Sequence, residues 1–154
     1  MVFINMIKIR AATINDAEKI AKDNLLLTVE SENLKINYET TLKAVKSIIK
    51  DKSKGFLIVA EENNDIVGHL MITYEWSDWR NKNIWWIQSV YVDKKHRKQG
   101  VFTKMVDHIK NMASENNVDI IRLYAHEDNK NAIKAYEKTN MIKKPYVIYE
   151  ISSN

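Results

Sequence analysis

The chain has 154 residues, 45% of them hydrophobic, which is enough for one globular domain with a real core. It contains no cysteine, which excludes disulfides, thiolate metal sites and a cysteine nucleophile. The net charge is +4, but lysines and glutamates are mixed along most of the chain, as on an ordinary solvated surface.

The first residues, 1–5, are too few and too uncharged to form a signal peptide. No apolar run approaches the roughly 20 residues that a membrane-spanning helix needs. We therefore expect one domain over residues 1–154, with a short leader at 1–5, in a soluble cytoplasmic protein.

Hydrophobic periodicity predicts elements in the order β-α-α-β-β-β-α-β-α-β. The expected strands are apolar or alternating runs bounded by polar turns, at 7–12, 55–62, 65–76, 83–92, 119–126 and 146–151. The expected helices are amphipathic, at about 15–32, 38–52, 99–113 and 129–139. This order predicts an α/β fold with a mixed sheet and helices on both of its faces.

The connection between the strand 83–92 and the next helix contains KKHRK, 94–98, in which five consecutive side chains are cationic or can become so. A helix that begins at Gln99 or Gly100 leaves its first N–H groups unpaired, and such an end binds phosphate well. Arg97 and Lys98 add charge, and Gly100 lets the backbone approach a bulky anion. The alternative is an ordinary helix start with surface lysines. A Walker loop or GxGxxG turn is excluded, because the glycines that it needs are missing here.

Two motifs identify a family resemblance. RKQGVF, 97–102, matches the arginine and the first glycine of the pattern Gln/Arg-x-x-Gly-x-Gly/Ala, with Phe102 in the last position. NKNAIKAYEKTNM, 129–141, matches NxxAxxxYxKxGF, with Asn140 and Met141 in place of Gly and Phe. On these motifs, and on the order of elements along nearly the whole chain, the sequence resembles the GNAT family, the GCN5-related N-acetyltransferases. Phe102 shares a helix face with apolar residues, so we expect its ring to point into the core.

The resemblance implies the GNAT fold, with the central sheet splayed at the acetyl-CoA site. It implies that the backbone of Val90, Tyr91 and Val92 binds the pantetheine arm, that Asn129 bonds the pantetheine amides, and that Tyr136 lies near the CoA sulfur. The implied pyrophosphate cradle consists of Arg97, Lys98, Gln99, Gly100, Val101 and Phe102. The implied reaction is direct attack by a primary amine on the acetyl thioester, with acetyl-CoA as co-substrate.

The catalytic residues predicted are Tyr136, as donor to the departing sulfur, and Glu75, as first candidate for the base. Tyr136 also lies at helical spacing from other apolar residues, so it could be a core aromatic. Glu30 and Asp78 are alternative bases. Each of these carboxylates could instead be an ordinary solvated group, and a water chain could replace a single base.

EWSDWRNKNIWW, 75–86, holds all four tryptophans, which would wall an acceptor pocket, form a dimer face or pack in the sheet. The four histidines show no ligand spacing, so no metal is expected. Two other functions stay open: a catalytically silent acyl-CoA sensor of the same fold, and a nucleic-acid binder that uses 94–98. The expected partner is a small-molecule or peptide amine, with no nucleic acid and no membrane, and a homodimer fits by analogy. The residues that select the acceptor are expected at 25–54 and around Trp79.

Overall fold

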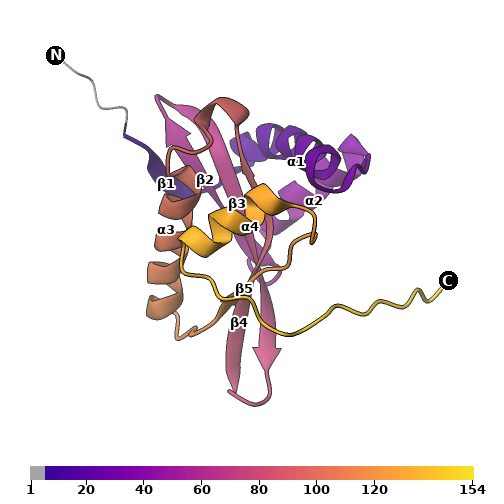
Figure 1. Ribbon diagram of the computed structural model, residues 1–154. Helices are drawn as coiled ribbons and strands as arrows, with labels where there is room; N and C mark the ends of the chain where they lie inside the picture. The colour runs from indigo at the N-terminus through magenta and orange to yellow at the C-terminus, as the bar shows by residue number, and fades with distance from the viewer. Residues whose placement is uncertain (1–5) are drawn as a thin grey trace.

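The structure is a computed structural model that describes residues 6–154, so the expected leader at 1–5 lies outside the described residues. It is a five-stranded mixed sheet in the order β1-β2-β3-β4-β5, with helices on both faces, which confirms the expected fold class (Figure 1). The strands are β1 (Lys8–Ala11), β2 (Gly55–Glu62), β3 (Asp65–Ser77), β4 (Lys82–Val92) and β5 (Ile121–Arg122). The helices are α1 (Ala17–Glu32), α2 (Tyr38–Lys50), α3 (Val101–Glu115) and α4 (Lys130–Lys138), with short 3-10 turns η1 (Ile14–Asp16) and η2 (Lys94–His96).

The two faces of β2 separate the core into two layers. Leu57 and Val59 are buried in a cluster formed with α1 and α2, whereas Ile58 and Ala60 are buried in the cluster that contains α3. Successive side chains of a strand point to opposite faces, so α1 and α2 lie on one face of the sheet and α3 on the other. β2 is therefore buried on both sides, which explains its continuous apolar sequence.

The meander β2-β3-β4 is antiparallel, and asparagine forms its turns. Asn63 and Asn64, between β2 and β3, have φ values of 51° and 67°, and Asn81, before β4, has a φ of 49°. Asparagine tolerates this left-handed region better than most residues. Glycine is required at one place: Gly55 has a φ of 147°, and a Cβ there would lie 1.9 Å from the carbonyl oxygen of Ile72.

The sheet opens between β4 and β5. These strands run parallel, but they pair only at Trp85 with Ile121 and at Trp86 with Arg122. The register between β3 and β4 shifts directly beyond this point and leaves Gln88 as an extra residue on β4. Because a bulge bends and twists its strand, β4 turns away from its parallel neighbour. The expected strand at 119–126 is therefore confirmed only over two residues.

The expected closing strand at 146–151 is not formed, and this part of the predicted order is corrected. The segment has no ladder partner in the structure and runs away from the sheet to the C-terminus, shown in yellow in Figure 1. Apolar alternation identifies an extended segment, but a strand also needs a neighbour for its backbone groups, and that neighbour cannot be located from the pattern.

Candidate functional site

The loop between β4 and α3 presents unpaired backbone N–H groups. Lys98 and Gly100 both have a left-handed backbone, with φ values of 61° and 80°. Gly100 is the N-cap of the 15-residue helix α3, and no side chain caps that end. A Cβ at Gly100 would meet no atom within 4 Å, so the space in front of the helix is open. Such a turn at a helix N-terminus forms a concave site for an anion.

The Arg97 side chain folds back from this loop across the end of β4. Its Nε donates to the carbonyl oxygen of Val92 at 2.8 Å, and its Nη2 donates to Glu30 Oε2 on α1 at 2.7 Å. The guanidinium carbon lies 5.3 Å from the centre of the Tyr91 ring. Lys94 Nζ lies 3.6 Å from the same Glu30 carboxylate. Glu30 thus holds two cations of the basic loop.

The edge of β4 that faces the opening offers the backbone groups of Val90 and Val92. The Asp93 N–H donates to the carbonyl of Val67 on β3, so the backbone groups of Asp93 and Tyr91 point toward β3. By alternation, those of Val90 and Val92 point toward β5, which has already diverged from β4. The hydrogen bond from Arg97 Nε to the Val92 carbonyl agrees with a carbonyl that points away from β3. The Tyr91 side chain is buried and stacks on His69, with ring centres 6.4 Å apart.

The start of α4 faces the end of α1 across a cavity. Asn129 caps α4, because its Oδ1 accepts from the Ala132 N–H at 3.3 Å, which leaves its Nδ2 group to donate to a ligand. A cavity of about 340 Å³ is lined by Glu30, Ser31 and residues 128–131. Because Glu30 also binds Arg97, this cavity and the basic loop share one wall.

Tyr136 lies on α4 and packs against the first turn of α3. Its ring centre is 5.6 Å from that of Phe102. Phe102 is half-buried against the core cluster under α3, which confirms the expectation for its ring. Burial raises the pKa of the Tyr136 hydroxyl above its ordinary value of 10. The phenol therefore stays protonated at neutral pH and can donate a hydrogen bond.

Glu75 lies on a part of the sheet that no helix covers. Its Oε2 is 3.5 Å from Arg122 Nη1, and Trp86 packs on Tyr124 beside them, with ring centres 6.2 Å apart. Its carboxylate is partly exposed, as is that of Glu30. Asp78 lies in the turn between β3 and β4. The structure thus brings Glu30, and neither Glu75 nor Asp78, into contact with the basic loop.

The four tryptophans have different environments. Trp85 is buried in the core, where its ring meets Phe56 edge to face at 5.0 Å. Trp76 and Trp79 are exposed to 63% and 87%. Core packing therefore explains Trp85, whereas it does not explain the exposed Trp76 and Trp79, which are accessible to another molecule.

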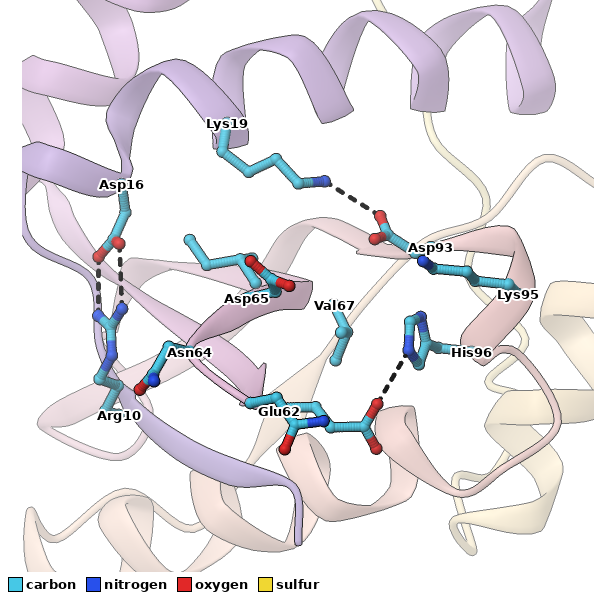
Figure 2. Close-up of a pocket in the computed structure, with 12 residues that line it drawn as sticks. Arg10, Asp16, Lys19, Glu62, Asn64, Asp65, Val67, Asp93, Lys95 and His96 are labelled. Carbon is cyan, nitrogen blue, oxygen red and sulfur yellow. Dashed lines mark hydrogen bonds and ion pairs between the residues drawn. The ribbon is translucent and has the colours of Figure 1, made fainter. Parts of the chain in front are cut away.

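A larger cavity, of about 530 Å³, lies on the other side of the loop, between η1, the β2-β3 turn and η2 (Figure 2). Its charges are largely paired. Figure 2 shows Arg10 bound to Asp16, Lys19 to Asp93, and His96 to Glu62 at 3.1 Å. Hydrogen bonding to Arg10 lowers the pKa of the Asp16 carboxyl. The pairs made by Asp93 and His96 hold the first half of the loop against α1 and β2.

A buried polar group under α1 was missed by sequence reasoning. His69 is fully buried, and its Nε2 lies 3.0 Å from Asn24 Oδ1. Burial, together with the nearby Lys19 charge, lowers the pKa of His69 to about 3, so the ring is neutral. Asp23, also buried, binds Lys19 at 2.7 Å. Only the alternation of β3, which points His69 toward α1, could have indicated this position.

Among residues 6–154, no group of three or more histidine, aspartate or glutamate side chains is arranged to hold a metal ion. In the same part of the chain, no helix is both long and apolar enough to cross a bilayer.

Comparisons with known proteins agree with this geometry. The sequence pattern described as "Acetyltransferase (GNAT) family" matches residues 22–141. No curated protein matches the chain. Among solved structures, a possible acetyltransferase from Clostridium difficile 630 is 40% identical, with a TM-score of 0.89, over 97% of this chain and 99% of that one.

Two more distant structures share the fold. One, described as "predicted acetyltransferase with acetyl-CoA", from Clostridium acetobutylicum, has a TM-score of 0.77 at 20% identity, over 95% of this chain and 96% of that one. The other, an aminoglycoside acetyltransferase from an uncultured soil metagenomic sample, has a TM-score of 0.74 at 20% identity, over 96% of both chains.

Proposed function

We propose that this chain, which belongs to the acetyltransferase (GNAT) family, is an N-acetyltransferase that moves an acetyl group from acetyl-CoA to a primary amine. The observation that carries the proposal is the coincidence, at one end of β4, of an unpaired helix N-terminus and an open strand edge. A pyrophosphate fits the first and an amide-containing arm fits the second. One ligand that carries both groups is acetyl-CoA.

The residues that would hold acetyl-CoA have suitable groups. The backbone N–H groups from Gln99 to Phe102 would bind the pyrophosphate, with Lys98 supplying charge at the rim. Val90 and Val92 would extend their ladder to the pantetheine amides, as a missing strand would. Asn129 would donate from Nδ2. Arg97 has first to release Val92, because its Nε now occupies that carbonyl.

In the reaction, a neutral amine attacks the thioester carbon and a C–N bond forms. The C–S bond then breaks and the thiolate leaves, while the nitrogen gives up a proton that ends on the sulfur or in solvent. Tyr136 would donate a hydrogen bond to the sulfur as negative charge develops there. A thiol has a pKa of about 8.5, below that of tyrosine, so the phenol stabilises the thiolate mainly by hydrogen bonding and not by complete proton transfer.

The amine must lose a proton before it attacks. Glu75 stays our first candidate for the base, since it lies on the uncovered face next to β5, where its Oε2 is 3.5 Å from Arg122 Nη1. Glu30, at the cavity wall, already binds Lys94 and Arg97 of the basic loop in this structure. Water can replace either carboxylate, so loss of Glu75 should reduce turnover without abolishing it.

The acceptor is an amine of small-molecule or peptide type. The exposed ring of Tyr124, which packs on Trp86 at the uncovered sheet face, offers an aromatic surface on which such an acceptor could pack. Leu26 and Val29 of α1 are also about half exposed, and they lie within the region expected to select the acceptor.

The test is release of free CoA from acetyl-CoA across a panel of amines, with calorimetric titration of acetyl-CoA in parallel. We expect amine-dependent release, lost by at least about 100-fold in Tyr136→Phe with acetyl-CoA affinity retained. The double variant Arg97→Ala, Gly100→Glu should lose binding, because it removes a cation and places a carboxylate in the anion site. Normal turnover by Tyr136→Phe would refute the assignment of the donor.

The same experiment separates the alternative functions. A silent acyl-CoA sensor would bind acetyl-CoA but release no CoA with any amine. A nucleic-acid binder would bind neither well and would show affinity that falls steeply with salt. The ion pairs of the basic cluster favour the enzyme over the nucleic-acid binder, because His96 and Arg97 already bind the carboxylates of Glu62 and Glu30.

A further inference from the structure

The sheet carries polar and aromatic side chains on a face that α1 and α2 cover only in part, since the β3-β4 hairpin extends beyond both helices (Figure 1). Under these helices, Leu57 and Val59 are buried and Met71 is half-buried. Farther along β3, β4 and β5, the side chains of the same face alternate with residues of the core under α3, so they point away from that core. This group, here called the sheet patch, consists of Thr73, Glu75, Trp86, Gln88, Arg122 and Tyr124.

The strand pairing places Arg122 at the mouth of the opening between β4 and β5. Trp86 pairs with Arg122 on one side and with Thr73 on the other, so these three side chains form a row across the three strands. The pair of Trp86 and Arg122 is the last one before β4 and β5 separate. In the proposed function the pantetheine arm runs from the basic loop along the free edge of β4 toward this point. The thioester end of the arm would therefore lie beside the row.

Arg122 has hydrogen-bond donors that the protein leaves unused. Among residues 6–154, the one hydrogen bond of its side chain runs from Nη1 to Glu75 Oε2, and its length of 3.5 Å is long for such a bond. A guanidinium is a planar fork of N–H donors, which fits a carboxylate at two points. The Arg122 side chain is partly exposed, so a ligand can reach this fork from solvent.

The charges of Glu75 and Arg122 complement a ligand that carries an amine and a carboxylate next to each other. With the ligand carboxylate on Arg122 and its ammonium on Glu75, one long ion pair is exchanged for two charge-assisted hydrogen bonds. An α-amino acid has both groups on one carbon, which suits two partners that lie 3.5 Å apart. Gln88 adds an acceptor for the amine, because its Nε2 donates to Thr73 Oγ1 at 2.9 Å and leaves Oε1 to accept.

The rings beside this ion pair suit an apolar or aromatic side chain on the ligand. Trp86 and Tyr124 lie next to Arg122, with ring centres 6.2 Å apart, and Tyr124 is exposed to 57%. A ligand side chain that packs on these rings would bury apolar surface on both partners. A lysine side chain or the N-terminus of a peptide has no carboxylate next to its amine, so either would leave Arg122 without a partner.

We propose that the acceptor is a free α-amino acid with an apolar or aromatic side chain, and that Arg122 selects it by binding its carboxylate. This inference rests on the proposed N-acetyltransferase function. Binding also prepares the reaction, because Arg122 turns from Glu75 to the ligand and leaves Glu75 facing the ammonium group. Glu75 then takes the first proton from the ammonium. Formation of the C–N bond, cleavage of the C–S bond and loss of the second proton follow as in the general reaction.

The test compares acceptors that differ only at the carboxylate, namely L-phenylalanine, L-phenylalaninamide and 2-phenylethylamine, by the release of CoA from acetyl-CoA. We expect kcat/KM for phenylalanine to exceed that for the other two by about 10- to 100-fold, the range for hydrogen bonds to a charged group. Arg122→Gln should bring the ratio of phenylalanine to 2-phenylethylamine to within about threefold of one, with acetyl-CoA affinity retained. Arg80→Gln is the matched control, because Arg80 lies exposed in the β3-β4 turn, and it should leave the ratio unchanged.

Arg122→Lys keeps the charge but offers a point contact in place of the planar fork, so it should retain only part of the preference. It also decides the matter should Arg122→Gln fail to fold.

The outcomes separate this inference from the proposed function. If the natural protein acetylates other amines but does not prefer phenylalanine, the choice of acceptor is overturned and the function stands. If the preference survives in Arg122→Gln, or in full in Arg122→Lys, Arg122 does not recognise the carboxylate through its fork and its assignment is overturned. If acetyl-CoA binds but no amine releases CoA, the proposed function itself fails, and this inference fails with it.

Discussion

Glu30 forms an ion pair with Arg97, the arginine that the pyrophosphate is proposed to contact. The variant Glu30→Gln should therefore bind acetyl-CoA more tightly. In the free protein, Arg97 is held by the Glu30 carboxylate at 2.7 Å and by the Val92 carbonyl at 2.8 Å. Both contacts compete with the ligand, the first for the guanidinium and the second for the strand edge. Removing the carboxylate charge weakens the first contact and frees the arginine to move.

The magnitude follows from the exposure of the pair. The side chains of Arg97 and Glu30 are exposed to 39% and 29%, so solvent screens their attraction, and such a pair is worth about 0.2–1 kcal/mol. Every 1.4 kcal/mol is tenfold in affinity, so losing the pair alone gives up to about fivefold. Removal of one negative charge near an anionic ligand acts in the same direction. We expect about three- to tenfold tighter binding at low salt, and less at high salt.

The assay is calorimetric titration with acetyl-CoA at low and at high ionic strength. Glu32→Gln is the matched control, because it removes the same charge from an exposed position on the same helix, and it should change affinity less than about twofold. If Glu30→Gln binds more weakly than the natural protein, Glu30 positions Arg97 for the ligand and the competition argument is refuted. If the natural protein itself does not bind acetyl-CoA, the proposed function fails instead.

Three further predictions test the core, the loop and the base. The pKa of His69 is about 3 in the folded chain and 6.5 in the unfolded chain, so between these values only the unfolded chain binds the proton and stability falls as the pH falls. Urea titrations should show that this group contributes about 2 kcal/mol less stability at pH 5 than at pH 7.5. The variant His69→Gln should lose that part of the pH dependence. Gly55→Ala should unfold the protein or lower its stability by more than about 3 kcal/mol, because the new Cβ would overlap the Ile72 carbonyl. Gly100→Ala, whose Cβ would lie in open space, should lower stability by only about 1–2 kcal/mol, because of the positive φ. Equal losses of stability in thermal unfolding would contradict this. Glu75→Gln should lower kcat while acetyl-CoA affinity stays constant, and an unchanged kcat would favour a water chain.

The sequence predicts the elements whose signals are local. The three meander strands lie within a residue or so of the expected ranges, because alternation, β-branched residues and asparagine turns all agree there. The expected first helix begins instead with η1, whose Asp16 bonds to the N–H of Thr13. The loop at 97–102 is recognisable because its proposed function depends on backbone conformation, which Gly100 indicates in the sequence.

Contacts between distant segments escape that reasoning. The pairing of Arg97 with Glu30 joins residues 67 positions apart, and that of His96 with Glu62 joins residues 34 apart. The five adjacent residues 94–98 look like one basic patch in the sequence, yet the fold turns Lys94, His96 and Arg97 toward carboxylates. The bulge at Gln88 likewise leaves no signal in the sequence, because the residue itself is ordinary and the bulge arises only from the register shift between β3 and β4.

Phe102 explains how the loop accommodates a departure from the family pattern. The groups proposed to face the ligand are backbone N–H groups, which every residue except proline supplies, so the side chain in the last motif position matters only if it enters the proposed anion site. The helical direction at 102 turns it instead toward the α3 core, where it also packs on Tyr136. An aromatic ring in place of Gly or Ala therefore leaves the cradle open and limits the rotation of the proposed donor. The activity of this loop should depend more on the left-handed conformations at Lys98 and Gly100 than on the small size of residue 102.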